Sequence, residues 1–121
     1  MKTLLLATRN EGKKMELQEM LNDIGISVIN LHDIPPLPEV VEDGKTFKEN
    51  AEKKAYETAK ATGYWCLADD SGLVVDALNG QPGIYSARFA GPEASDENNN
   101  HKLLDLMKGI DESKRTARFV C

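Results

Sequence analysis

The densest polar chemistry of the chain lies in residues 69–89, which begin with Asp69, Asp70, Ser71 and Gly72. These residues directly follow the apolar run Trp65–Ala68, which has the character of a buried strand. Side chains at the end of such a strand are held rigidly while they face a cleft, so two adjacent carboxylates there suit metal binding or base catalysis. Because Asp, Ser and Gly also favour turns, a plain tight turn is the alternative.

A second polar segment joins an apolar strand to a helix and consists of Thr8, Arg9, Asn10, Glu11, Gly12 and Lys13. The N-terminus of a helix offers free backbone N–H groups and the positive end of the helix dipole, which together bind phosphate. Thr8 and Asn10 can donate hydrogen bonds to phosphate oxygens, and Lys13 can neutralise them. Asn10 is also expected to be the N-cap of the helix. The Gly-x-x-x-x-Gly-Lys-Ser/Thr pattern of P-loop proteins is absent.

Acidic and basic side chains are segregated around the next helix. Glu39, Glu42 and Asp43 precede this helix, and Lys53 lies on it. If the loop carboxylates converge with Asp70, they form an all-oxygen site of the kind that Mg²⁺ prefers, bridging to phosphate oxygens. Such a metal lowers the pKa of a bound water, and a neighbouring carboxylate can take the proton of that water for attack on phosphorus. The residues therefore predict a metal-assisted reaction on a phosphorylated small molecule.

The elements that position these residues follow from the hydrophobic periodicity. Five segments have strand character, at 3–7, 26–31, 65–68, 73–78 and 115–121. Three helices are expected, from Asn10 to Gly25, from Thr46 to Gly63 and from Ser95 to about Gly109. The first of them carries an apolar stripe that consists of Leu17, Met20, Leu21 and Ile24.

The alternation of these elements predicts an α/β fold, with a mixed central sheet flanked by helices and a site in a cleft at the strand ends. The continuous apolar run at 3–7 fits a strand that is covered on both faces. At 121 residues the chain has the size of one domain, so a single domain over residues 1–121 is expected.

The composition excludes several classes of partner. The net charge of −5 argues against a broad binding surface for nucleic acid or an anionic membrane. No apolar run approaches the roughly 20 residues that span a bilayer, and no cleavable leader precedes the first strand, so a soluble cytoplasmic protein is expected. Cys66 and Cys121 lack metal-ligand spacing and are expected to be reduced and buried.

Three ordered motifs closely resemble the inosine triphosphate pyrophosphatase (Ham1-like) family, namely residues 7–16, residues 46–51 with Lys54 and Ala55, and residues 69–89. The resemblance covers nearly all of the chain, including the final Arg118–Cys121. It implies hydrolysis of the non-standard purine nucleotides ITP, dITP or XTP to the monophosphate and pyrophosphate. It also implies Mg²⁺ as cofactor, water attack at the α-phosphorus, and a homodimer.

The resemblance also implies roles for single residues. Thr8, Asn10 and Lys13 would hold the phosphates within the 8–13 loop. Asp70 would be the metal-linked general base, and Ser71 would contact the substrate. The second metal ligand would be Glu42, which precedes the turn into the second helix, with Glu39 as the alternative, and Lys53 would be a further phosphate ligand. No role for Arg88 follows from the spacing.

The family pattern departs from this chain at its end. Family members continue through a Phe-Gly-Tyr-Asp segment, a later lysine and a Ser-His-Arg motif that together grip the purine base, and none of these occurs here. The C-terminal part of the family fold is therefore expected to be absent. One alternative is accordingly a nucleotide-binding fragment without turnover. Another is an aspartic-protease-like hydrolase, suggested by Asp-Ser-Gly before an apolar run and opposed by the expected helices.

Overall fold

The structure is a computed structural model that describes residues 2–121. It comprises two compact units, Met1–Asp69 and Asp70–Cys121. The single domain expected from the chain length stays a prediction.

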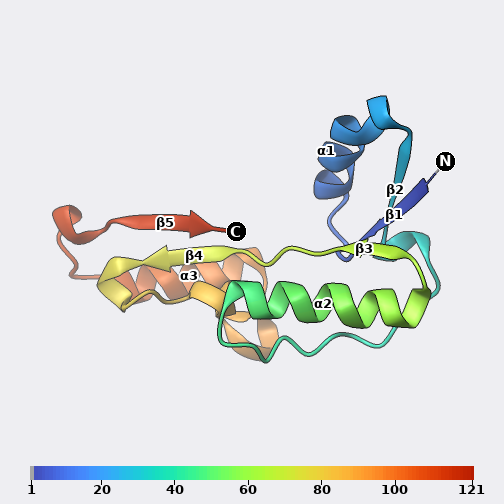
Figure 1. The fold of residues 1–121 in the computed structure, drawn as a ribbon. Coiled ribbons are helices and arrows are strands. Elements are labelled where there is room, and N and C mark those ends of the chain that lie inside the picture. The colour runs from blue at the N-terminus through green and yellow to red at the C-terminus, as the bar shows by residue number, and fades with distance from the viewer. Residues whose placement is uncertain (1) are drawn as a thin grey trace. The chain divides into compact units, whose positions relative to one another are not determined.

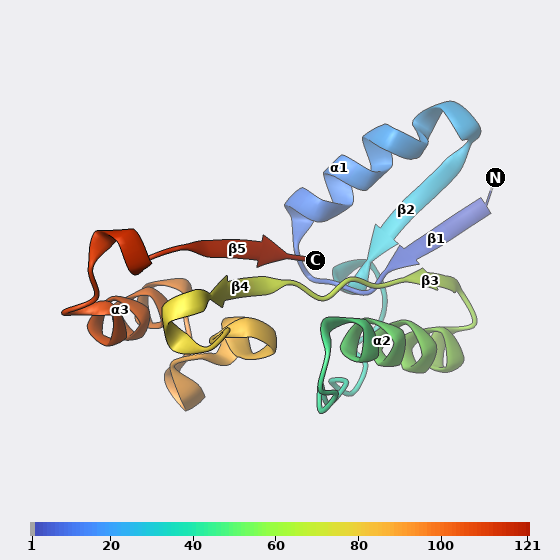
Figure 2. The same ribbon diagram turned by 60° about the vertical axis from the view of Figure 1, so that its left-hand side comes forward.

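The first unit is built on a parallel three-stranded sheet in the order β2-β1-β3 (Figure 2). Its strands are β1 (Lys2–Leu6), β2 (Ile26–Asn30) and β3 (Trp65–Leu67). In the register, Leu6 is opposite both Asn30 and Leu67, so the C-terminal ends of all three strands lie side by side. The apolar core of this unit consists of Leu5, Leu6 and Val28 on these strands and of Ala7, which directly follows β1.

Two helices accompany this sheet, and both begin where the sequence predicts, whereas α1 ends at Leu21, before the predicted Gly25. Helix α1 (Glu11–Leu21) packs on β2 and continues as a 3-10 turn to Gly25, whose φ is 71°. Helix α2 (Phe47–Thr62) packs on β3 and ends at Gly63, whose φ is 77° (Figure 1). A left-handed conformation of this kind favours glycine, which explains why both residues stop their helices.

The apolar stripe of α1 is less buried than expected. Met20 is 76% exposed and Ile24 is 66% exposed. Polar contacts attach this helix to β2 instead: the backbone N–H of Val28 donates to Oε1 of Gln18 at 2.7 Å, and Nε2 of Gln18 donates to the carbonyl of Ile26 at 2.9 Å. The side-chain amide of Gln18 thus satisfies backbone groups on the outer edge of β2.

The prediction of a buried strand at 65–68 is wrong in its burial. The strand forms as β3, but Trp65 is 69% exposed and Leu67 is 43% exposed, because β3 lies at an edge of the sheet. The cysteine expectations need a similar correction. Cys66 is only half-buried, although this burial still raises the pKa of its thiol, and Cys121 is exposed.

The second unit is an antiparallel strand pair with one helix. Strands β4 (Gly72–Val75) and β5 (Ala117–Val120) pair with Leu73 opposite Phe119 (Figure 1). Helix α3 (Asp96–Met107) has Ser95 as its N-cap, as predicted. The strand predicted at 73–78 ends at Val75, because residues 76–78 form a 3-10 turn that Asn79 closes with a φ of 54°.

The fold class is therefore α/β, as predicted, with a parallel sheet and accompanying helices. An aspartic-protease fold is nearly all β, and α1, α2 and α3 exclude it. Across residues 2–121, no helix has both the length and the apolar character that crossing a membrane requires.

Candidate functional site

The Thr8–Lys13 loop has the geometry of a capped helix start. The Asn10 side chain accepts a hydrogen bond from the backbone N–H of Lys13 at 3.1 Å, which confirms Asn10 as the N-cap. The Thr8 hydroxyl accepts from the backbone N–H of Asn10 at 3.2 Å. A Cβ at Gly12 would lie 3.2 Å from Oδ1 of Asn10, so glycine leaves room for the cap. Glu11 and Gly12 are the first two residues of α1, where backbone N–H groups have no partner within the helix.

Backbone hydrogen bonds fasten this loop to the edge where the strands end. The N–H of Ala7 donates to the carbonyl of Leu67 at 2.8 Å, and the N–H of Leu31 donates to the carbonyl of Thr8 at 3.0 Å. The loop is therefore tied to the last residue of β3 and to the residue that follows β2. A loop held in this way can present its N–H groups to a ligand with little loss of conformational freedom.

The lysine of this loop contacts the first carboxylate of the Asp69-Asp70 pair. Nζ of Lys13 lies 2.7 Å from Oδ2 of Asp69, and the two side chains are 40% and 29% exposed. The sequence analysis located Lys13 and Asp69 after two different strands but did not predict that their side chains form an ion pair. The signal was the parallel sheet itself, because the carboxyl ends of parallel strands share one edge. The contact brings a cation and a carboxylate together beside a helix N-terminus.

A second polar cluster holds the loop before α2. Oε1 of Glu42 lies 2.9 Å from Nζ of Lys54, and Oδ1 of Asp43 accepts from Nζ of Lys53 at 2.8 Å. The hydrogen bond from Lys53 lowers the pKa of Asp43, and the same hydrogen bond raises the pKa of Lys53. The N–H of Gly44 donates to Oδ1 of Asn50 at 2.8 Å. Three successive loop residues are thus fixed to one helix.

Lys54 is a candidate site residue that the sequence reasoning did not single out. Its side chain is 19% exposed, against 30% for that of Lys53, and it contacts the carboxylate that we expect to bind metal. The available signal was its spacing of four residues from Asn50, which places both side chains on one face of α2. Asn50 itself is 1% exposed.

The two candidate metal ligands of this loop lie in different surroundings. Glu39 lines a groove between residues 37–41 and α2, together with Lys53, whereas Glu42 is held by Lys54. Within residues 2–121, the structure has no group of three or more His, Cys, Asp or Glu side chains that could hold a metal ion.

In the second unit, the segment Asp70–Gly72 begins the unit and leads into β4. The N–H of Leu73 donates to the Ser86 hydroxyl at 2.9 Å, and this hydroxyl donates to the carbonyl of Gly83 at 2.7 Å. A Cβ at Gly72 would lie 2.6 Å from Oγ of Ser86 and still closer to the carbonyl oxygen of Gly83. Glycine is therefore required at position 72 by the close approach of residues 83–86.

The same 3-10 segment, Gly83–Arg88, is fixed from α3. Nδ2 of Asn99 donates to the carbonyls of Ser86 and Ala87, and Oδ1 of Asn99 accepts from the N–H of Ala90 at 2.8 Å. The Arg88 guanidinium lies over the ring of Tyr85 at 5.1 Å from its centre. The segment is thus held by polar contacts on both sides, from β4 and from α3.

The structure therefore brings some of the predicted site residues together and leaves others untested. Lys13 contacts Asp69 at the strand ends, and Lys53 contacts Asp43 beside Glu42. Asp70 and Ser71 belong to the second unit, so the convergence of Asp70 with Glu42 and the substrate contact of Ser71 stay predictions. Arg9 is exposed in the 8–13 loop.

The sequence also matches known proteins. The profile of the Ham1 family matches residues 4–121. A dITP/XTP pyrophosphatase of Geobacter sulfurreducens is 54% identical over 121 residues, which are 100% of this chain and 61% of that protein. A dITP/XTP pyrophosphatase of Streptococcus thermophilus is 57% identical over 117 residues, 96% of this chain and 36% of that protein. The chain spans 61% of the first relative's length and 36% of the second's.

Solved structures share the fold. A HAM1 protein from Coxiella burnetii has a TM-score of 0.86 and 43% identity, over 98% of this chain and 60% of that chain. A nucleoside-triphosphatase / dITP/XTP pyrophosphatase from Mycobacterium abscessus has a TM-score of 0.81 and 44% identity, over 97% of this chain and 61% of that chain.

Proposed function

The chain belongs to the Ham1 family, and from this membership we propose that it acts on non-standard purine nucleoside triphosphates such as ITP, dITP and XTP. The proposed reaction is attack of water on the α-phosphorus. The bond between this phosphorus and the oxygen that bridges to the β-phosphate breaks, and the nucleoside monophosphate and pyrophosphate are released. The names of the relatives support this substrate class.

The observation that carries the proposal is the capped start of α1 with Lys13 beside it. Exposed N–H groups of the first helical turn, the helix dipole and a lysine form a binding site for a polyphosphate. Nζ of Lys13 is already held 2.7 Å from Asp69, next to the expected general base in sequence. Substrate phosphates that bind here would therefore lie close to where the Asp70 backbone begins.

Each residue has a distinct role in the proposed reaction. Thr8 and Asn10 orient the phosphates with their side chains, Glu11 and Gly12 contribute backbone N–H groups, and Lys13 neutralises charge. These residues bind and orient the substrate before the bond breaks.

In the second unit, Asp70 accepts the proton of the attacking water, and Ser71 contacts the substrate. The segment Gly83–Arg88 limits the freedom of this strand start through Ser86. In the first unit, Lys53 and Arg9 are secondary phosphate ligands, because Lys53 is engaged by Asp43 and Arg9 extends to the surface.

The donor set fits Mg²⁺. Mg²⁺ in nucleotide enzymes is held by one or two carboxylates, with waters and substrate phosphates as the other ligands. Glu42 and Asp70 would supply those carboxylates, and the Lys54 contact keeps Glu42 in place. When bound, the metal would add positive charge at the phosphate oxygens of the substrate. Glu42 is preferred to Glu39 because Glu39 lines the groove with Lys53.

The proposal extends to partners and location. We expect a homodimer in the cytoplasm that binds neither nucleic acid nor membranes, in keeping with the net charge of −5.

The decisive experiment is phosphorus NMR of ITP incubated with the chain and Mg²⁺, which separates pyrophosphate from orthophosphate. Pyrophosphate with IMP would support the proposed reaction. Orthophosphate with IDP would contradict attack at the α-phosphorus. Binding of ITP without any product would favour a nucleotide-binding fragment that does not turn over.

A further inference from the structure

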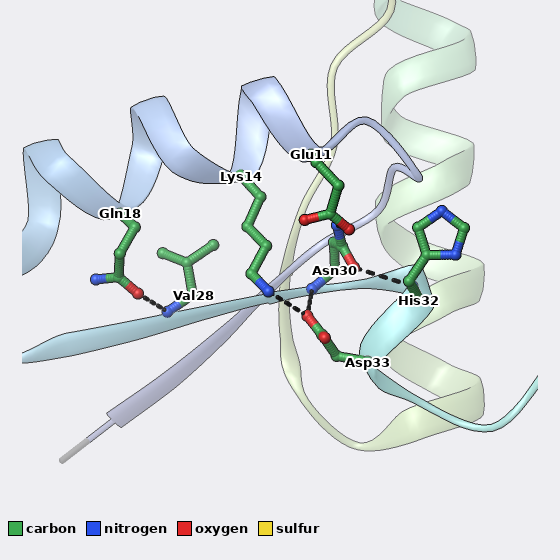
Figure 3. A network of polar contacts seen from close by, with 7 residues as sticks. All are labelled: Glu11, Lys14, Gln18, Val28, Asn30, His32 and Asp33. Atoms are coloured by element: carbon green, nitrogen blue, oxygen red, sulfur yellow. Dashed lines mark hydrogen bonds and ion pairs between the residues drawn. The ribbon is translucent and has the colours of Figure 1, made fainter.

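A network of polar side chains fastens the start of α1 to the end of β2 (Figure 3). Nδ2 of Asn30 donates to Oε1 of Glu11 at 3.0 Å. Nζ of Lys14 lies 2.7 Å from Oδ2 of Asp33, and the same oxygen accepts from the backbone N–H of Asn30 at 2.9 Å. The network thus joins the carboxylate of Glu11, which belongs to the Thr8–Lys13 loop, to the Asn30 amide, and the carboxylate of Asp33 to Lys14 and the Asn30 backbone.

Asn30 is the buried centre of this network. Its side chain is 0% exposed, and its Oδ1 accepts from the backbone N–H of His32 at 2.9 Å. Both ends of the amide are therefore used, one toward Glu11 and one toward the chain that follows β2. This position therefore requires a side chain that donates one hydrogen bond and accepts another. An apolar side chain can do neither. The amide is also rigidly placed, because Asn30 is paired with Leu6 in the sheet.

The carboxylate that Asn30 holds stands at a sensitive position. Glu11 is the first residue of α1, so its backbone N–H belongs to the proposed phosphate-binding site, while its side chain carries a negative charge. An anion is stabilised by a helix N-terminus, so a carboxylate that is free to move there competes with phosphate for the same N–H groups. Lys14 adds a second attraction, because its charge interacts with Glu11 as well as with Asp33.

We propose that Asn30 is a positioning residue for phosphate binding, which holds the Glu11 carboxylate on β2 and so keeps the N-terminus of α1 open to the substrate. The inference rests on the proposed function of the 8–13 loop. It adds a residue that has no contact with the substrate and that acts through Glu11.

The test measures the affinity of the chain for inorganic tripolyphosphate by calorimetry with Mg²⁺ present, beside ITP hydrolysis. Asn30→Ala frees the Glu11 carboxylate, and one competing unit charge about 4 Å away in water weakens binding by about 1 kcal/mol, or about fivefold in Kd. In the Glu11→Gln background the same Asn30→Ala change should leave Kd the same, because no charge is released. Glu11→Asp should also weaken binding about fivefold, because the shorter carboxylate no longer reaches Asn30.

Gln18→Ala is the matched control. Gln18 also joins α1 to β2 by side-chain hydrogen bonds, but it lies two turns further along the helix and releases no charge. It should lower thermal stability and leave the Kd for tripolyphosphate unchanged. Glu11→Asp breaks the same hydrogen bond from an exposed residue and leaves Asn30 in place, so it provides the test if Asn30→Ala fails to fold.

The outcomes separate the two proposals. Equal weakening by Asn30→Ala in both backgrounds, or none in either, would overturn the positioning role. A wild-type chain that binds tripolyphosphate but does not release pyrophosphate from ITP would contradict the proposed function alone. A wild-type chain that does not bind tripolyphosphate would overturn both.

Discussion

The sharpest structural prediction concerns Gly72, where the chain has no room for a side chain. In Gly72→Ala, the new Cβ would meet Oγ of Ser86 at 2.6 Å and would lie still closer to the carbonyl oxygen of Gly83. The Gly83 carbonyl is backbone and already accepts the Ser86 hydroxyl, so it cannot turn away without breaking that hydrogen bond. Strand β4 must therefore shift away from residues 83–86.

The cost follows from the contacts that the shift would break. Overpacking of a filled site lowers the free energy of unfolding by about 1–3 kcal/mol. Because the neighbour here is rigid backbone, we expect a loss of about 3 kcal/mol. The hydrogen bond from Leu73 to Ser86 is strained by the same movement. For a chain of this size, about 3 kcal/mol corresponds to a fall in Tm on the order of 10 °C. Because Asp70 and Ser71 directly precede the displaced residue, ITP turnover should be lost as well.

Thermal unfolding followed by circular dichroism measures this effect, with Gly109→Ala as the matched control. Gly109 has a φ of 80° and no atom within 4 Å of a built Cβ, so alanine there meets only backbone strain, about 1–2 kcal/mol. We expect Gly72→Ala to lower Tm several degrees more than Gly109→Ala. Equal Tm values for the two variants would refute the steric argument at Gly72.

Three further predictions test the site and its support. Asp70→Asn should lower kcat for ITP by about 10²–10⁴-fold while the circular dichroism spectrum is unchanged, as expected for removal of a general base; turnover at the wild-type rate would contradict that role. Lys13→Met should weaken tripolyphosphate binding about tenfold or more in a calorimetric titration, because a charge-assisted contact is lost, whereas Lys48→Met, whose side chain is 85% exposed, should bind as the wild type does. The hydrogen bond from Thr116, together with Arg118, lowers the pKa of Asp76 below its ordinary value of 3.8, so this carboxylate stabilises the folded state above that pH and the contribution is lost as pH falls through the lowered pKa. The Tm should therefore fall on acidification below about pH 4 more steeply in the wild type than in Asp76→Asn, and parallel pH profiles would count against it.

The sequence alone determined the features that depend on neighbours along the chain. The N-caps Asn10, Thr46 and Ser95 were correct, because each cap bonds an N–H only three residues away. Gly25 ends the 3-10 turn after α1 and Gly63 ends α2, and both positions follow from the left-handed backbone that a helix end adopts. The uninterrupted apolar run of β1 indicated a strand covered on both faces, and β1 is the central strand of its sheet.

Burial was harder to predict from the sequence. An outer strand and a central strand of a sheet can have the same apolar sequence pattern, so the exposure of Trp65 was not predicted. The end of β4 at Val75 was missed for a similar reason, because Ala77 and Leu78 continue the apolar run into a 3-10 turn.

The tertiary structure decided which side chains meet. Lys13 and Asp69 are 56 residues apart in sequence, and only the shared edge of the parallel strands brings them to 2.7 Å. The same holds for Glu42 with Lys54 and for Asn30 with Glu11, where a polar pair forms across two elements. The residue types and their order predicted the chemistry of the chain. The partners of each polar group could not be predicted, because they depend on how the strands are ordered and how each helix is rotated against them.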